Sequence, residues 1–257
     1  MRVENNREPG GAGAFLGTPK EKLAIIMGAE GLARLDRARV MVLGLGGVGS
    51  NCVEALARGG VGHLVVLDHD IVSESNINRQ AIAYRSTLGR KKVDVVRAMV
   101  ADINPACEVE TIDSFVRAAD VAALMDEYAP RVDYVVDAID SVSTKLALAE
   151  YADRTGLTLI SSMGGGNKLH PECLRIADVY DTVKCPLSRV MRKECRKRGV
   201  RSLRVLFSFE DPVRTRGRAG ATRKERSDLG TASFMPPIMG QMIAGEVIRH
   251  LAGVGES

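Results

Sequence analysis

Aromatic residues are scarce in this 257-residue sequence: tryptophan is absent, and aromatic side chains make up only 4% of the chain. Proteins that bind single-stranded nucleic acid by stacking its bases need aromatic platforms, so this class is disfavoured. Long apolar runs are also missing, because the longest uncharged stretch, Leu229 to Gly245, is short for a span and contains two prolines. We therefore expect no membrane span, and the lack of a signal segment at the start predicts a cytoplasmic protein.

Cysteine is rare and scattered, with five residues at Cys52, Cys107, Cys173, Cys185 and Cys195. Their odd number and wide spacing are typical of reduced thiols in a cytosolic enzyme and argue against a disulfide framework. No Cys-x-x-Cys pair occurs, so a tetrahedral zinc site built from paired thiolates is not expected. The remaining composition, 45% hydrophobic and 26% charged, is that of a globular protein.

Acidic residues are sparse in one part of the chain, residues 184–226, which we call the basic segment. Fifteen lysines and arginines stand there against four acids, so the segment carries +11 in a chain whose net charge is +4. A positive field of this strength attracts a phosphate polyanion or an acidic partner protein. The alternative is a solvated helix face followed by a loop, with no binding role.

Short apolar runs alternate with helical patterns along most of the chain. We expect strands at 39–43, 63–67, 108–112, 134–139 and 157–161, and helices at 21–37, 48–58, 91–103, 121–128 and 144–155. The first helix is expected to break near Gly28 and Gly31. Continuous valine, isoleucine and leucine runs joined by helices indicate a parallel sheet covered on both faces. The predicted fold class is α/β, a doubly wound, mainly parallel Rossmann-like sheet with helices on both faces.

The regular alternation ends after about Gly166. Two further strands, at 174–180 and 203–209, flank a basic helix at 188–198, and a closing helix is expected at 237–251. We interpret these elements as a C-terminal extension of the same sheet. Residues 1–19, which are rich in glycine, are expected to be a flexible lead-in, and residues 20–257 to form a single domain.

A glycine-rich turn follows the first expected strand and opens the next helix, with glycines at Gly44, Gly46, Gly47 and Gly49. Such a turn lets the backbone approach a phosphate, and the helix N-terminus supplies amide donors. Asp68 ends the second strand, at the usual distance for binding ribose hydroxyls. These features predict a nucleotide site. The alternatives are helix–strand packing for the glycines and a turn cap for Asp68.

The residues after Asp68 favour ATP over a nicotinamide cofactor. Arg79 lies just beyond the strand, among amide side chains, and Lys92 begins the next helix. Arginine and lysine clamp a triphosphate and stabilise charge that develops at phosphorus, whereas hydride transfer has little use for them. Asp140 ends the fourth strand at the same crevice, where a carboxylate can hold Mg²⁺ through water. The alternatives are surface ion pairs for Arg79 and Lys92 and a helix N-cap for Asp140.

These motifs resemble the ubiquitin-activating (E1-like, ThiF-type) superfamily, whose members adenylate carboxylates with ATP. The match extends to Ser75-Asn76-x-Asn78-Arg79-Gln80, Gly89-x-x-Lys92 and Val136-Asp137-Ala-Ile-Asp140-Ser141. The resemblance implies that residues 20–257 are an E1-like adenylating domain that forms a homodimer and uses ATP and Mg²⁺. It implies catalytic roles for Arg79, Lys92 and Asp140, with Mg²⁺ held by Asp140 through water. The implied nucleotide contacts are Gly44, Gly46, Gly47, Asp68, Asp70, Asn76, Arg79, Gln80, Lys92 and Asp140.

Within this superfamily, the chain resembles the tRNA threonylcarbamoyladenosine dehydratase branch. The similar stretches include Ser162-Met-Gly-Gly-Gly-Asn167 and Cys185-Pro-Leu-x-Arg189. The resemblance implies ATP-dependent dehydration of N6-threonylcarbamoyladenosine in tRNA, through adenylation of its carboxylate and cyclisation with release of AMP and pyrophosphate. The basic segment suits a tRNA partner because phosphate contacts dominate tRNA affinity. The predicted docking residues are Arg192, Lys193, Arg196 and Lys197.

Two other functions stay open at this point. An E1-like enzyme can instead adenylate the C-terminus of a ubiquitin-like or sulfur-carrier protein, with a sulfurtransferase or carrier protein as its partner. A non-catalytic nucleotide-binding adaptor would keep the glycines and need neither Lys92 nor Asp140.

Two further residues carry open questions. Lys22 stands where many superfamily members have an arginine that reaches the partner subunit's ATP, and a lysine lacks the bidentate fork. Cys185 is either a covalent acceptor, as cysteines are in ubiquitin-type activators, or an ordinary cysteine at a helix start. Because an intramolecular cyclisation needs no thioester, the second interpretation is favoured.

Overall fold

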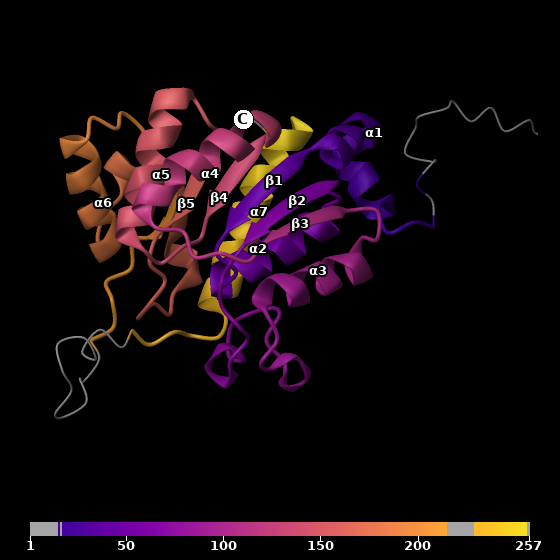
Figure 1. The fold of residues 1–257 in the computed structure, drawn as a ribbon, viewed down its shortest axis with the longest axis horizontal. Coiled ribbons are helices and arrows are strands. Elements are labelled where there is room, and N and C mark those ends of the chain that lie inside the picture. The colour runs from indigo at the N-terminus through magenta and orange to yellow at the C-terminus, as the bar shows by residue number, and fades with distance from the viewer. Residues whose placement is uncertain (1–14, 16, 215–228, 256–257) are drawn as a thin grey trace, which may run out of the picture.

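The computed structural model describes residue 15, residues 17–214 and residues 229–255. Within them, seven strands form one sheet in the order β3-β2-β1-β4-β5-β7-β6 (Figure 1). Their bounds are β1 Arg39–Leu43, β2 His63–Leu67, β3 Glu108–Ile112, β4 Tyr134–Asp137, β5 Leu159–Ser162, β6 Leu174–Asp178 and β7 Arg204–Ser208. All neighbouring strands are parallel except β6, which runs antiparallel to β7. The predicted α/β class and the C-terminal extension of the sheet are confirmed.

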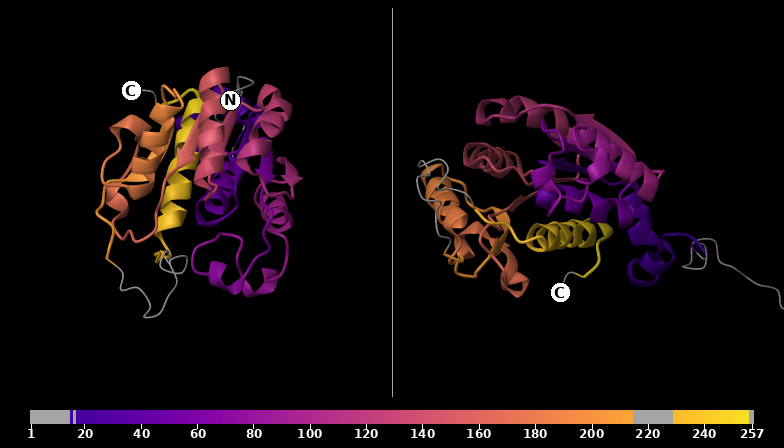
Figure 2. Two further views of the ribbon diagram at one scale, coloured as in Figure 1. Left: turned by 60° about the vertical axis from the view of Figure 1, so that its left-hand side comes forward. Right: turned by 90° about the horizontal axis from the view of Figure 1, so that it is seen from below.

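Helices connect the strands and cover both faces of the sheet (Figure 2). Their bounds are α1 Glu21–Arg37, α2 Gly47–Arg58, α3 Lys92–Ile103, α4 Val121–Tyr128, α5 Val142–Thr155, α6 Pro186–Lys197 and α7 Met235–Ala252. The last helix, α7, packs against α2, although the two are far apart in the sequence (Figure 1).

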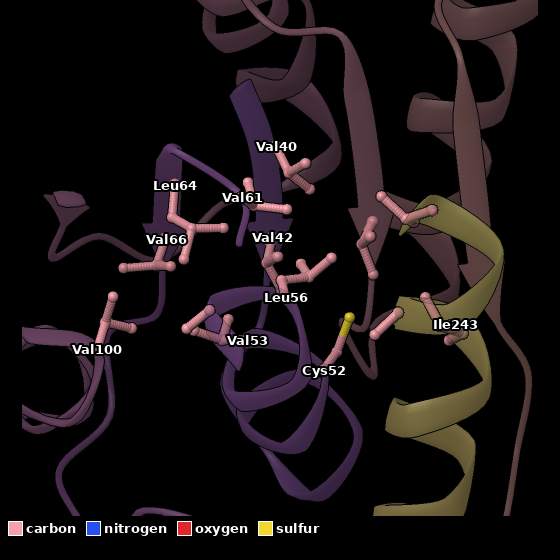
Figure 3. Packing of buried hydrophobic residues seen from close by; sticks show 14 of the residues in the cluster. Val40, Val42, Cys52, Val53, Leu56, Val61, Leu64, Val66, Val100 and Ile243 are labelled. Atoms are coloured by element: carbon pink, nitrogen blue, oxygen red, sulfur yellow. The ribbon is translucent and has the colours of Figure 1, made fainter. Parts of the chain in front are cut away.

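Consecutive side chains of the central strands enter two different hydrophobic cores. In β1, Val40 and Val42 join the cluster formed with α1, α2, α3 and α7 (Figure 3), whereas Met41 and Leu43 join the cluster formed with α4, α5 and α6. All four side chains are fully buried. A strand that is covered on both faces must be apolar at every position, which explains the continuous apolar runs in the sequence.

Several element boundaries differ from those expected by one or two residues; β5, for example, begins at Leu159 instead of residue 157. Gly28 interrupts α1 with a left-handed φ of 69°, but Gly31 is a buried helical residue and not a break. Strand β4 ends at Asp137 instead of continuing to residue 139, because the Asp137 carboxylate accepts a hydrogen bond from the Ile139 amide and turns the chain. Strand β6 ends in the same way at Asp178.

The uncharged stretch that begins at Leu229 forms most of α7 and belongs to the core. Met235, Met239 and Ile243 have no exposed surface. Residues 1–14 and 16 of the expected lead-in and residues 215–226 of the basic segment lie outside the described residues. None of the helices in the described part of the chain is long and apolar enough to cross a membrane.

Candidate active site

A cavity of about 710 Å³ lies at the C-terminal ends of β1, β2, β4 and β5. The loops that follow parallel strands meet at this edge of a sheet, which is where ligands bind in such folds. Every residue that the sequence assigned to nucleotide binding lines this cavity: Gly44, Gly46, Gly47, Asp68, Asp70, Asn76, Arg79, Gln80, Lys92 and Asp140. The structure therefore brings the predicted set together, while the role of each residue stays a prediction.

The turn between β1 and α2 presents bare backbone to the cavity. Gly44 has a left-handed φ of 88°, and a Cβ there would lie 2.7 Å from the Ala138 carbonyl oxygen, so only glycine fits. At Gly46, apart from its neighbours in the chain, no atom of the described residues lies within 4 Å of the Cβ position, which leaves open space for a ligand. Because α2 begins at Gly47, its free amides and the positive end of its dipole lie at the cavity wall.

Asp68 links this turn to the loop after β2. Its Oδ2 accepts a hydrogen bond from the Leu45 amide at 2.6 Å, and its Oδ1 accepts one from the Asp70 amide at 2.8 Å. Lys92 Nζ lies 2.7 Å from Asp70 Oδ2 and 3.9 Å from Asp68 Oδ2. The Lys92 side chain is buried, so the alternative of an ordinary surface ion pair is wrong for this residue.

Arg79 brings a second cation to the cavity. Its Nη1 donates to the Ser75 carbonyl at 2.9 Å and to Asn78 Oδ1 at 2.8 Å. No carboxylate of the described residues pairs with this guanidinium, so its charge is available to an anionic ligand. The neighbouring Asn76 is buried, and its Oδ1 accepts the Ser73 amide and holds the loop in place.

Asp140 lies exposed on the cavity wall, in the turn between β4 and α5. It does not cap α5, because Ser141 is the N-cap residue and its Oγ accepts the Thr144 amide at 3.4 Å. Among the described residues, nothing donates a hydrogen bond to the Asp140 carboxylate. A free carboxylate beside a phosphate-binding turn fits a divalent cation with oxygen ligands. The alternative of a helix N-cap is therefore wrong for Asp140.

A buried ion pair at the floor of the cavity was not predicted from the sequence. Lys145 Nζ lies 3.0 Å from Asp137 Oδ2, and Ser161 Oγ donates to the same oxygen at 2.5 Å. The Lys145 side chain also lines the cavity. The spacing of these residues, with Lys145 one turn into the helix that follows Asp137, was the available signal.

A second element that was not predicted is the wall formed after β5. Residues 162–166 line the cavity together with Leu187 at the start of α6 and Leu229. Phe115 lies at another part of the cavity, exposed, with its ring edge-on to His69 at a centroid distance of 4.7 Å. In the sequence, the glycine run after β5 was noted only because it resembles the dehydratase branch, and no role was predicted for it.

The predicted tRNA-docking residues lie on α6 and differ in how exposed their side chains are. Arg192 is half-buried, and its Nη1 donates to the Thr182 carbonyl at 2.6 Å, so it holds the protein's own backbone. The side chains of Lys193, Arg196 and Lys197 are exposed. Five of the basic residues of this segment lie outside the described residues: Arg216, Arg218, Arg223, Lys224 and Arg226.

The two open questions receive different answers. Lys22 projects from α1 with its side chain 86% exposed, and it does not line the cavity. Its assignment to a partner subunit's site stays a prediction.

Cys185 is buried in the hydrophobic cluster beneath α6 and does not line the cavity either. An ordinary cysteine at a helix start is the interpretation that this geometry supports.

The sequence is similar to a known protein family and to proteins of named activity. The ThiF family matches residues 20–257. The tRNA threonylcarbamoyladenosine dehydratase of Bacillus subtilis is 38% identical over 241 residues, which cover 90% of this chain and 93% of that protein. The enzyme of the same name from Haemophilus influenzae is 36% identical and covers 86% of this chain and 88% of that protein.

Solved structures agree with the sequence relatives. The tRNA N6-threonylcarbamoyladenosine dehydratase of Escherichia coli, TcdA, in complex with ATP, superimposes with a TM-score of 0.80 at 30% identity. The match covers 90% of this chain and 93% of that one. A complex of the same protein with AMP matches equally well, so that enzyme binds both the expected substrate and the expected product nucleotide.

Proposed function

The chain belongs to the ThiF family, and from this we propose that it uses ATP to dehydrate N6-threonylcarbamoyladenosine in tRNA. The relatives that carry this activity in their names match nearly the whole chain. The observation that carries the proposal is the set of residues that line one cavity. It holds a phosphate-binding turn, the cations of Arg79 and Lys92, and the free carboxylate of Asp140.

In the first step, an oxygen of the threonyl carboxylate bonds to the α-phosphorus of ATP. The bond from that phosphorus to the bridging oxygen breaks, and pyrophosphate leaves with the electron pair. Negative charge grows on the phosphoryl oxygens, so fixed donors and cations that are already in place lower the barrier. We assign that role to the first amides of α2 and to Arg79 and Lys92.

In the second step, the ureido oxygen attacks the acyl carbon of the adenylate. The bond from this carbon to the AMP oxygen breaks, AMP leaves, and the ureido nitrogen loses a proton as the oxazolone ring closes. The carboxylate oxygen departs within AMP, which accounts for the net loss of water. A Mg²⁺ ion held by Asp140 through water would offset charge on the phosphates.

We also propose the partners and the place of the reaction. The exposed cations of α6 would bind tRNA phosphates, and the reaction would take place in the cytoplasm, where its tRNA substrate is available. A homodimer is a further proposal. The apolar stretch in α7 is core and offers no interface, but Ile25 and Ile26 of α1 are 67% and 72% exposed and form an apolar patch.

One assay tests the proposal against the carrier-protein alternative. Purified protein is incubated with ATP and tRNA that carries the linear modification, and the nucleosides are then analysed by mass spectrometry. We expect the modified nucleoside to lose one water, with AMP and pyrophosphate formed in equal amounts. An unchanged nucleoside, together with pyrophosphate exchange into ATP only when a small carrier protein is present, would replace the proposal by the alternative.

A further inference from the structure

We propose that the backbone amides of Gly164, Gly165 and Gly166 bind the carboxylate of the substrate, at the end of the cavity away from the phosphate-binding turn. The inference rests on the proposed function, because it concerns the group that would be adenylated. The three glycines follow β5 and line the same cavity as Asp140. Since β4 lies between β1 and β5 in the sheet, the loop that carries Asp140 separates them from the turn after β1.

Three successive amides are open in this segment. The Met163 amide donates to the Leu206 carbonyl, and the Asn167 amide donates to the Gly230 carbonyl, each at 2.8 Å. Between these two, no acceptor within residues 15, 17–214 and 229–255 pairs with the amides of residues 164–166. The three glycines are half-buried, and successive backbone amides in a concavity form a binding site for anions.

The packing of the three glycines also indicates a ligand. A Cβ at Gly165 would lie 2.5 Å from Met239 Sδ, and one at Gly166 would lie 2.9 Å from Leu229 Cβ, so a side chain at either position would force a neighbouring side chain to move. At Gly164 the nearest atom to a Cβ is 3.8 Å away, on Leu187, and φ is not left-handed. The protein's own packing therefore tolerates a methyl group at residue 164, where it would take up space that a ligand needs.

An independent feature of the same cavity calls for a ligand with a polar hydrogen. Gln80 lines the cavity and is 7% exposed, and its buried Oε1 has no hydrogen-bond partner within the described chain. An unpaired buried acceptor costs free energy until a donor completes it. The threonylcarbamoyl group carries ureido N–H and hydroxyl donors beside its carboxylate, so one ligand has groups for both Gln80 and the open amides.

The surroundings of the glycines favour a carboxylate over a chain of phosphates. Their neighbours in the cavity wall are apolar side chains: Met163, Leu187, Leu229 and Met239. A triphosphate would lose much of its hydration against such a wall. For a single carboxylate, hydrogen bonds from several amide donors would offset the lost hydration. The triphosphate already has Arg79, Lys92 and the α2 amides on the other side of Asp140. A carboxylate at the glycines would therefore approach the α-phosphorus from the side opposite the nucleotide's own donors.

The decisive variant is Gly164→Ala, with Gly245→Ala as its matched control. Gly245 lies on α7, outside the cavity, and a Cβ there meets only the end of the flexible Arg249 side chain at 3.9 Å. For Gly164→Ala we expect the KM for modified tRNA to rise by about tenfold or more, because the added methyl group would keep the carboxylate from its charge-assisted hydrogen bonds with the amides. ATP affinity by calorimetry, and inhibition by unmodified tRNA, which lacks the carboxylate, should stay as in wild type. The control should match wild type in all three measurements.

A direct readout does not depend on the variant folding. The wild-type protein, labelled with ¹⁵N only at its 26 glycines and loaded with a non-hydrolysable ATP analogue, is titrated with N-carbamoyl-L-threonine. We expect the amide signals of Gly164, Gly165 and Gly166 to move downfield, as they do when amides donate to a carboxylate.

The outcomes separate this inference from the proposed function. A wild-type enzyme that dehydrates modified tRNA while Gly164→Ala does so with unchanged KM would overturn the carboxylate site and leave the function intact. Shifts confined to glycines outside residues 164–166 would overturn it as well. A wild-type enzyme that binds the carbamoyl-threonine at these amides but never dehydrates modified tRNA would instead contradict the proposed function.

Discussion

Lys145 and Asp137 form an ion pair that is almost completely shielded from water, with Nζ and Oδ2 3.0 Å apart and side chains 2% and 0% exposed. The pair joins the end of β4 to the first turn of α5. Asp137 Oδ1 accepts the Ile139 amide at 3.1 Å, so the same carboxylate shapes the turn that carries Asp140. The pair therefore holds a residue of the candidate site in position.

Removing one member of this pair should destabilise the protein strongly. Lys145→Met leaves the Asp137 carboxylate buried without a cation, and we expect the free energy of unfolding to fall by about 3–5 kcal/mol in urea denaturation. The double variant Asp137→Asn with Lys145→Met contains no uncompensated charge and should recover part of that loss. Lys22→Met is the control on an exposed side chain and should change little. Equal losses in the single and double variants would contradict this account.

Asp140→Asn should separate binding from chemistry. The carboxylate is free in the structure, so the substitution removes a charge without breaking a hydrogen bond among the described residues. We expect ATP affinity to stay within a few fold and turnover to drop by roughly a hundredfold, because the missing stabilisation acts mainly in the transition state. Calorimetry and single-turnover kinetics measure the two effects. Near-normal turnover would remove Asp140 from the catalytic set.

The exposed cations of α6 should control tRNA affinity. Because Arg192 is engaged with Thr182, the informative variant changes only Lys193, Arg196 and Lys197 to glutamine. We expect weaker tRNA binding, and a plot of log affinity against log salt that is shallower by about one for each tRNA phosphate that the variant no longer neutralises. ATP affinity should not change, since none of these residues lines the cavity.

A charge-matched control is available for that experiment. Arg37, Arg58 and Arg97 are exposed arginines outside the basic segment, and changing them to glutamine removes the same charge. If both triple variants weaken tRNA binding equally, the effect reflects net charge and α6 is not the docking surface.

Cys185 should prove dispensable for turnover. Four of the five thiols, including this one, are buried, and only Cys173 is half-buried. Burial also raises the pKa of Cys107 and of Cys195 to about 11, so both are protonated thiols, and unreactive, at pH 8. We expect a disulfide reagent to titrate one thiol rapidly in the native protein and all five after denaturation, and Cys185→Ser to turn over like wild type. An inactive but folded Cys185→Ser variant would revive the covalent-acceptor hypothesis.

The proposed dimer should depend on α1. Light scattering of the wild-type protein should give twice the 27.7 kDa mass of one chain. Replacing Ile25 and Ile26 with glutamate places charge on the exposed apolar patch and should shift the mass toward the monomer. A monomeric wild-type protein at micromolar concentration would contradict the proposal, and a dimer unaffected by the glutamates would place the interface elsewhere.

The parts of the fold that the sequence predicts best are those where burial alone dictates the pattern. Strands β1 and β2 begin and end at the predicted residues, because apolar runs of this length have few ways to be buried. The bounds of β3 and α4 were also predicted correctly, although β3 is a half-exposed edge strand. The ends of β4 and β6 were predicted too late in the chain, since hydrogen bonds that the Asp137 and Asp178 carboxylates accept from backbone amides decide them. Such bonds depend on local geometry that periodicity does not report.

The candidate site was predictable for a similar reason. The residues after parallel strands must meet at one edge of the sheet, so Asp68, Lys92 and Asp140 converge in any fold of this topology. The pairing of Lys145 with Asp137, the bond from Arg192 to Thr182, and the open amides after β5 depend on distances in space. Periodicity and composition do not report which residues meet in space, so the only sequence signals were the spacing of Lys145 from Asp137 and the glycine run after β5.

The position of α7 has a consequence for how the protein is made. Residues from this helix, near the end of the chain, pack on α2, which begins at the phosphate-binding turn, and Met235 touches the Gly165 position. A ribosome builds the chain from the N-terminus, so β1 and α2 emerge long before the helix that covers them. The packing around the glycine turn is therefore completed only after α7 has been made, and a product that stops before α7 would have the glycine turn but lack the packing that holds it in shape.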